Sequence, residues 1–252
     1  MKLHVFNDTD ELSLHVAEWI FNYITKTLQQ QDRFSIVLSG GNTPKKLYGL
    51  LVSEKYKNKI DWSKLHIFFG DERYVPFDDE RNNAKMAYDN LLNFVSVPAS
   101  QIHVMRTDIP PQESADEYEK ILRQYFSFTA DYSPLTTHLS PLTFDLVLLG
   151  MGDDGHTLSL FPGTSVIHEK EKWCTYLWLA QQNMYRITLT ASIVNQSSCV
   201  AFLVTGNNKA KALCEVLKGE YNPDKYPSQI IQPVNGELHW FGDAAAAGEL
   251  GD

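Results

Sequence analysis

The sequence contains few cysteines and no long apolar run. Its three cysteines, Cys174, Cys199 and Cys214, stand singly among apolar residues, without the CxxC spacing or the nearby histidine pattern of a zinc site. We therefore expect buried, reduced thiols. No stretch reaches the roughly 18 apolar residues that span a membrane, and the opening residues lack the apolar centre of a secretion signal. The sequence thus predicts a cytoplasmic protein without a membrane partner.

Basic residues are also scarce. Lys and Arg number 22 against 31 Asp and Glu, which gives a formal net charge of −9. Because nucleic-acid binding depends on many basic residues that neutralise phosphates, we expect no nucleic-acid partner. An anionic small molecule would need local cations and backbone N–H groups that overcome the repulsive field of an acidic surface.

Short runs of branched and aromatic residues alternate with helical patterns along the chain. This alternation is typical of βαβ units and predicts an α/β protein with an open, mainly parallel sheet flanked by helices. Since there is no internal repeat, and 128–143 looks like a surface loop and not a linker, we expect a single domain over 1–252. The predicted strands are 34–39, 65–70, 102–105, 144–150, 173–179 and 200–206, and the predicted helices are 11–31, 44–56, 83–95, 113–126 and 207–219.

Ligands of open α/β sheets bind beyond the carboxyl ends of the strands, which here means the loops after Ser39, Gly70, Gly150 and Gly206. The first of these loops reads GGNTP and leads into a helix. Its glycines allow the backbone to approach a ligand, and the N–H groups of the helix start can bind an anion. The loop fits neither a Walker A nor a GxGxxG pattern, so nucleotide binding is not indicated. A tight turn that binds nothing explains it equally well. The candidate residues in this loop are Gly40, Gly41, Asn42 and Thr43, the last of which could also cap the helix.

The second loop begins with Asp71, Glu72 and Arg73, directly after a predicted core strand. An arginine offers a planar fork for a phosphate or carboxylate, and Asp71 could accept hydrogen bonds from sugar hydroxyls. The alternative is a surface cluster of charges without a ligand. Further along, Arg81 could reach inward from a solvated loop.

The third loop, 150–163, reads GMGDDGHTLSLFPG and carries His156. Histidine is the candidate general base here, because its ordinary pKa lies near neutrality. Residues 157–161 resemble the start of a short helix that Asp153 or Asp154 could cap, and a purely structural histidine is the alternative reading.

Two further cations lie near other predicted strands. Lys209 stands in the first turn of the helix after Gly206, where a neighbouring anion would offset its unfavourable position on the helix dipole. Arg186 stands ahead of a predicted strand and is a possible anion contact. An ordinary surface lysine or arginine explains either residue nearly as well. Together the loops suggest a phosphorylated, polyhydroxylated small molecule held next to a histidine.

At this point the motifs, in their order, resemble those of 6-phosphogluconolactonases in the glucosamine-6-phosphate isomerase/6-phosphogluconolactonase superfamily. The resemblance extends over nearly the whole chain. It rests on SGGNTPKKLY, FFGDERYVP, FDLVLLGMGDDGHTLSLFPG, RITLT, VAFLVTGNNKAKAL and GELHWFGDAAAA.

The resemblance implies a modified Rossmann-like fold and a hydrolase that converts 6-phospho-D-glucono-1,5-lactone to 6-phosphogluconate, without metal or cofactor. It implies that His156 activates water, that Asp71 and Asp154 orient substrate or imidazole, and that Arg73 and loop N–H groups stabilise an oxyanion. The remaining candidates, Gly40, Gly41, Asn42, Thr43, Arg186 and Lys209, would hold phosphate and sugar. We expect a monomer or a weak homo-oligomer.

Two alternatives remain beside this interpretation. Glucosamine-6-phosphate deaminases share the DGH loop but have a glutamate a few residues beyond the histidine, where this chain has Phe161. An apolar ring cannot relay a proton. The second alternative is a sugar-phosphate sensor that kept the pocket without turnover. The chain also departs from the lactonase pattern at Asp153, Asn82 and 226–233, which leaves the nearby substrate contacts open.

Overall fold

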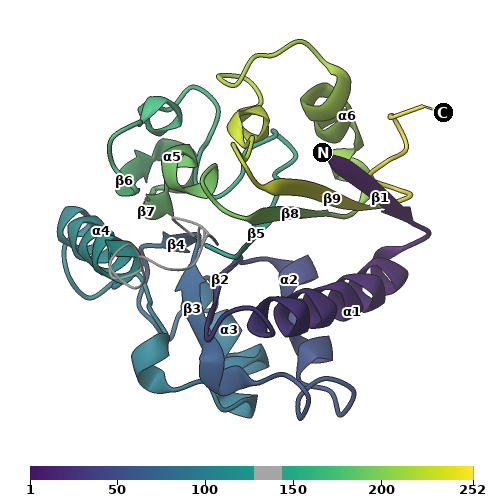
Figure 1. The fold of residues 1–252 in the computed structure, drawn as a ribbon. Helices are drawn as coiled ribbons and strands as arrows, with labels where there is room; N and C mark the ends of the chain where they lie inside the picture. Colours follow the sequence, from purple (N-terminus) through teal and green to yellow (C-terminus); the bar gives the residue numbers. More distant parts are fainter. Residues whose placement is uncertain (128–143, 252) are drawn as a thin grey trace.

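A six-stranded parallel sheet forms the centre of the computed structural model, which describes residues 1–127 and 144–251 (Figure 1). The strands lie side by side in the order β1-β9-β8-β5-β2-β3, and every neighbouring pair is parallel. They are β1 (Lys2–Phe6), β2 (Phe34–Leu38), β3 (Leu65–Phe69), β5 (Leu146–Gly150), β8 (Cys199–Val204) and β9 (Glu237–Asp243). This sheet confirms the predicted α/β class.

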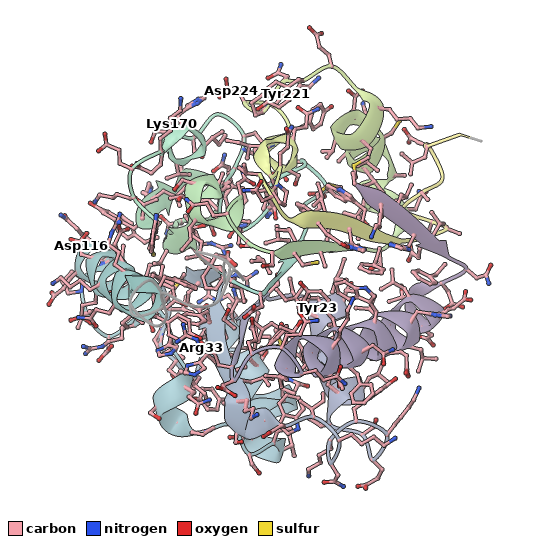
Figure 2. All side chains as sticks on the ribbon, viewed as in Figure 1. Tyr23, Arg33, Asp116, Lys170, Tyr221 and Asp224 are labelled. Carbon is pink, nitrogen blue, oxygen red and sulfur yellow. The ribbon has the colours of Figure 1, made fainter. Side chains whose placement is uncertain are left out.

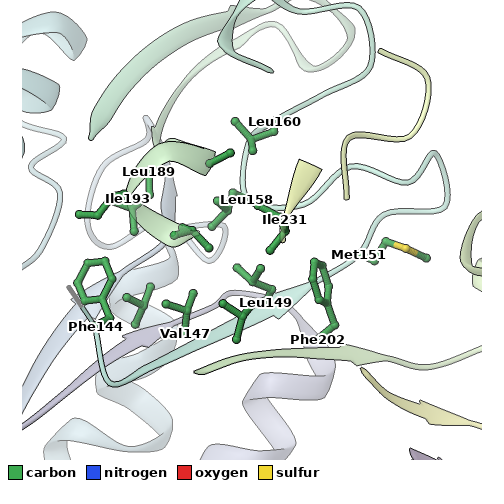
Figure 3. Packing of buried hydrophobic residues seen from close by; sticks show 14 of the residues in the cluster. Phe144, Val147, Leu149, Met151, Leu158, Leu160, Leu189, Ile193, Phe202 and Ile231 are labelled. Atoms are coloured by element: carbon green, nitrogen blue, oxygen red, sulfur yellow. The ribbon is translucent and has the colours of Figure 1, made fainter. Parts of the chain in front are cut away.

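Helices cover both faces of this sheet, so its central strands β5 and β8 are apolar along their length. Helices α1 (Thr9–Leu28), α2 (Asn42–Leu51) and α3 (Asn83–Asn90) pack on the face that carries Ile36 and Leu148. The opposite face, which carries Val147 and Phe202, packs against α4 (Pro111–Ser127), α5 (Ala191–Val194) and α6 (Ala210–Lys218). Figure 3 shows side chains of this second core above β5.

A second, three-stranded antiparallel sheet lies on the α4 side of the molecule (Figure 1). It consists of β4 (Asp71–Arg73), β7 (Met184–Leu189) and β6 (Cys174–Leu179), in that spatial order. The chain passes from one sheet to the other at Gly70, whose N–H donates to Leu38 of the first sheet and whose carbonyl accepts from Leu189 of the second. The end of β3 is thereby joined directly to the start of β4.

Short 3₁₀ turns complete the described chain. They are η1 (Trp62–Lys64), η2 (Leu92–Phe94), η3 (Ala99–Gln101), η4 (Ser165–His168), η5 (Ala180–Gln182), η6 (Asn207–Lys209) and η7 (Pro227–Ile230). Charged side chains such as Lys170 and Asp224 stand at the periphery (Figure 2). In the part of the chain that is described, no helix is both long and apolar enough to cross a bilayer.

Several predicted elements need correction. The strand predicted at 102–105 is absent, and Ile102 forms only an isolated bridge to Ile67. The strand predicted at 173–179 exists as β6, but it pairs antiparallel with β7 outside the main sheet. The strands β1, β4, β7 and β9 are absent from the predicted set. Strand β1 lies at the edge of the sheet, has exposed residues and lacks a continuous apolar run. The loop predicted at 128–143 lies outside the described residues.

The three cysteine thiols are free, as predicted. Cys174 and Cys199 are buried, whereas Cys214 is only half-buried. Burial raises the pKa of the Cys199 thiol to about 12, so it is protonated at neutral pH.

The core gives a stability prediction. Leu146 on β5 is fully buried, so Leu146→Ala should lower the free energy of unfolding by about 2–5 kcal/mol through lost burial and a residual cavity. Leu14 on α1 is 55% exposed, and Leu14→Ala is the matched control, with an expected change within about 0.5 kcal/mol. Urea unfolding monitored by circular dichroism measures both, and equal losses would contradict this assignment of the core.

Candidate active site

The candidate site lies where the chain order of the main sheet reverses. From β2 the chain proceeds to β3 on one side, whereas β5, on the other side of β2, leads to β8 and β9. Crevices at such switch points bind the ligands of open α/β sheets. A cavity of about 270 Å³ opens here. It is lined by Ser39, Gly40, Gly41, Asp71, Arg73, Gly150, Met151, Gly152, His156, Thr157, Leu158, Gln182, Arg186 and Lys209.

A second cavity, of about 370 Å³, adjoins the first. The two share Gly40, Gly41, Gly150, Met151 and Lys209. The second is completed by Asn42, Thr43, Pro44, Leu203, Thr205 and Asn208. Nine of the ten candidate residues therefore line one or both cavities, and the tenth, Asp154, contacts His156 directly.

His156 is oriented by Asp154. The imidazole Nδ1 lies 2.6 Å from Asp154 Oδ1, and the His156 backbone N–H donates to the same oxygen at 3.0 Å. Partial burial alone would raise the pKa of Asp154, but its hydrogen bonds and the charge interaction with His156 outweigh burial and lower this pKa. With Nδ1–H donating to a carboxylate, Nε2 is the nitrogen that can accept a proton. One face of the ring is covered by Phe161, at 4.0 Å between ring centroids.

The backbone of this loop is folded tightly around the His156–Asp154 pair. A Cβ at Gly152 would lie 2.1 Å from His156 Nδ1 and 2.4 Å from Asp154 Oδ1, so only glycine fits there. The helix predicted at 157–161 is absent. In its place a tight turn is closed by a bridge between Thr157 and Leu160, with Leu158 in the left-handed region at φ 53°.

Asp71 belongs to strand β4, not to a loop as predicted, and it is buried at 8% exposure. Its Oδ2 accepts from the Ser159 hydroxyl at 2.6 Å and lies 3.6 Å from a guanidinium nitrogen of Arg186. The other oxygen, Oδ1, is 3.3 Å from the amide nitrogen of Asn83. Both carboxylate oxygens are thus occupied by protein donors, and Asp71 holds Arg186 and the Ser159 turn in place.

Glu72 was not selected as a functional residue, yet it is fully buried. Its carboxylate accepts backbone N–H groups from Arg73, Asn83 and Ala84 at 2.7–2.9 Å, which ties β4 to the first turn of α3. Burial raises the pKa of Glu72 to about 7, although the three N–H donors oppose this change. Strand alternation in the sequence could have indicated the position of Glu72, because alternate side chains of a strand point to opposite sides and Glu72 therefore points away from Asp71 and Arg73.

Two arginines from opposite strands face this cavity. Arg73 on β4 pairs in register with Arg186, which lies within β7 and not ahead of it as predicted. The Nε atoms of both are buried and have no hydrogen-bond partner among the described residues. Burial lowers the pKa of Arg186, and the charge of Asp71 partly opposes this effect. Both guanidinium groups retain donors for a ligand.

Their remaining contacts also differ from the sequence-based expectations. Arg186 donates to the side-chain oxygen of Gln182, a cavity residue that was not predicted. Arg73 donates to the Arg81 carbonyl at 2.9 Å, whereas the Arg81 guanidinium pairs with Asp79 at 2.7 Å on the exterior and does not reach inward.

Two helix starts meet at the second cavity. Gly41 is the N-cap of α2, and Lys209 precedes α6. Thr43 does not cap its helix; its hydroxyl lies 2.8 Å from the Thr205 hydroxyl and so links the two loops. The Lys209 ammonium has no hydrogen-bond or ion-pair partner among residues 1–127 and 144–251. Backbone N–H groups and a free cation at converging helix starts suit a phosphate group.

The described part of the chain shows no set of side chains suited to bind a metal ion. No three His, Cys, Asp or Glu side chains of this part are grouped so that they could hold a metal ion.

Comparison with known proteins gives consistent matches along the chain. The family model described as glucosamine-6-phosphate isomerases/6-phosphogluconolactonase matches residues 7–240. A protein of Nostoc sp. named 6-phosphogluconolactonase is 39% identical over 249 residues, which are 98% of each chain. The crystal structure of 6-phosphogluconolactonase from Thermotoga maritima has a TM-score of 0.80 at 28% identity and covers 96% of this chain and 99% of its own. A monomeric glucosamine-6-phosphate deaminase has the same fold, with a TM-score of 0.80 at 18% identity over 99% and 100% of the two chains.

The buried Glu72 gives a prediction on pH dependence. Its pKa is raised from the ordinary 4.5 to about 7 in the folded protein, so the folded state holds a proton that the unfolded state has lost between these values. The free energy of unfolding should therefore fall as pH rises from about 4.5 to 7, by about 2–3 kcal/mol for this group. Glu72→Gln should lack this contribution. Urea titrations of both proteins at a series of pH values measure it, and parallel curves would refute the assignment.

Proposed function

We infer that this chain, which belongs to the glucosamine-6-phosphate isomerase/6-phosphogluconolactonase family, hydrolyses 6-phospho-D-glucono-1,5-lactone to 6-phospho-D-gluconate, the second step of the oxidative pentose phosphate pathway. The observation that carries the mechanism is the His156–Asp154 pair at the cavity, in which Asp154 occupies Nδ1 and leaves Nε2 free. A base held in this way can take a proton from water.

The chemistry follows from that geometry. Nε2 of His156 accepts a proton while the water oxygen attacks the lactone carbonyl carbon, and the carbonyl oxygen becomes an oxyanion. When the tetrahedral intermediate collapses, the bond between the carbonyl carbon and the ring oxygen breaks. The proton on Nε2 then passes to that ring oxygen, which becomes a hydroxyl group. Donors placed near the oxyanion lower the barrier. Arg73 and the loop N–H groups are our candidates for that task, because Arg73 lines the same cavity as His156.

The cations of the two cavities support a phosphorylated substrate. We assign the phosphate to the second cavity, at the helix starts, because Lys209 has no ion-pair or hydrogen-bond partner in the described part of the chain and Gly40 to Thr43 line this cavity. Arg186, which lines the first cavity, would contact the sugar acid or the phosphate from the β7 side. Asp71 acts through Arg186 and Ser159 in this proposal.

The deaminase alternative is disfavoured by Phe161. Its side chain is 6% exposed and stacks on His156, so an apolar ring occupies the place where the deaminase pattern has an acid. The sensor alternative predicts tight binding of phosphosugars without hydrolysis. The cytoplasmic location and the monomeric or weakly associated state remain predictions from the sequence.

The base assignment is tested with His156→Ala. Turnover of freshly generated 6-phosphogluconolactone, followed as acid release above the spontaneous rate, should fall by about 10²–10⁴-fold. His15→Ala, at an exposed position on α1, is the matched control and should leave turnover unchanged. A wild-type protein that binds 6-phosphogluconate but never exceeds the spontaneous rate would establish the sensor, and ammonia released from glucosamine 6-phosphate would establish the deaminase.

The phosphate assignment is tested with Lys209→Gln. Loss of a charge-assisted contact should raise KM for the phosphorylated lactone roughly 10–100-fold. The non-phosphorylated gluconolactone should be turned over equally by the wild type and this variant. Lys211→Gln, an exposed lysine on the same helix, is the control. An equal loss with both lactones would show that Lys209 does not bind the phosphate.

A further inference from the structure

The loop that carries His156 rests on a distant segment, residues 222–231. Ser228, at the second position of η7, directs two donors at one acceptor, the carbonyl oxygen of Gly155. Its backbone N–H lies 2.9 Å from that oxygen and its hydroxyl lies 2.8 Å from it. Ser228 is 1% exposed, so no solvent competes for these bonds. The carbonyl they hold belongs to the residue directly before His156.

The loop has no room to shift toward this segment. Gly155 has φ +77°, and a Cβ on it would lie 2.8 Å from Cδ1 and 3.3 Å from Cα of Tyr226. The last residue of the loop is attached to the same segment, because the Gly163 N–H donates to the Asp224 carbonyl at 3.0 Å. The His156 loop is therefore fixed to one support both beside His156 and at its end.

The support is itself anchored to the body of the protein. The Gln229 amide donates to the carbonyls of Glu215 and Glu220 at 3.0 and 3.1 Å and so joins the segment to α6 and the residues after it. Asn195 donates to the Ile230 carbonyl at 2.9 Å. Ile231 and Leu158 belong to the same core above β5 (Figure 3), whereas Asp224 lies in the outer, solvent-facing part of the segment (Figure 2).

We propose that Ser228 is a positioning residue, whose hydroxyl fixes the Gly155 carbonyl and thereby the place of the His156 imidazole. The proposal rests on the proposed function, in which His156 is the base. Any residue except proline at 228 could supply the backbone N–H, but the second donor comes only from the side chain. A base displaced by about 1 Å can lose most of its effect on the reaction while substrate binding is unchanged.

The first test compares Ser228→Ala with Ser197→Ala. Ser197 is also 1% exposed, but its hydroxyl has no hydrogen-bond partner in the described chain, so it controls for the loss of a buried hydroxyl. Ser228→Ala should lower kcat roughly tenfold and leave KM within about twofold, because the cations that bind substrate are untouched. Ser197→Ala should change neither constant. Equal kcat in wild type and Ser228→Ala would overturn the proposal.

A second measurement does not depend on turnover. In protein labelled with ¹⁵N-histidine, the ring signals of His156, assigned with His156→Ala, should move in Ser228→Ala and stay in place in Ser197→Ala. If Ser228→Ala fails to fold, Ser228→Cys keeps the side-chain size with a weaker donor and should give a smaller change of the same kind.

The two proposals fail in different ways. If the wild type does not hydrolyse the lactone, the proposed function fails, and the His156 signals alone decide whether Ser228 positions the ring. If the wild type is active and Ser228→Ala changes neither kcat nor these signals, only the role of Ser228 is refuted.

Discussion

The site depends on one geometric constraint, that parallel strands release the chain at the same edge of the sheet. Because β2 and β5 are neighbours and both end there, the glycine loop after β2 and the His156 loop after β5 open into the same crevice. The antiparallel sheet then adds groups from a second direction. Only Gly70 separates the first strand of this sheet, β4, from β3. Asp71, Arg73 and Arg186 therefore reach the crevice from the paired strands β4 and β7 and not from loops.

The acidic and the basic side chains of this site have different roles. The acids accept hydrogen bonds within the protein, whereas the cations keep donors for a ligand. The carboxylates of Asp71, Glu72 and Asp154 all accept hydrogen bonds from protein donors. Through these contacts the acids orient a cation, the backbone and the imidazole, respectively. Among the described residues that line the cavities, Lys209 and the two arginines keep donors without a partner. An acidic chain can thus present cations to an anionic ligand, because the buried acids Asp71 and Glu72 are paired with protein donors.

The sequence predicted correctly those features that depend on a local pattern of residues. Apolar runs such as those of β2, β5 and β8 identified inner strands, and the rule that ligands bind at strand ends placed the candidate residues at one crevice. The sequence-based prediction was wrong where contacts with segments far along the chain determine the local structure. The edge strand β1 is strand only because β9 lies beside it, and 157–161 forms a turn because Thr157 donates back to Gly150. Glu72 and Ser228 were not among the predicted site residues for the same reason. A polar residue that is buried by segments far along the chain looks like any surface residue in the sequence.

The register of the second sheet places Arg73 directly opposite Arg186, and the charge of Arg73 adds to burial in lowering the pKa of Arg186. Without a ligand the two guanidinium groups repel each other across the site, and the folded state bears that repulsion. An anion bound between them would offset the repulsion, so its binding would be thermodynamically linked to folding. At a ligand concentration of 100 Kd such linkage is worth about 2.7 kcal/mol. The free energy of unfolding of this protein would then rise with the concentration of an anion that binds between the two arginines.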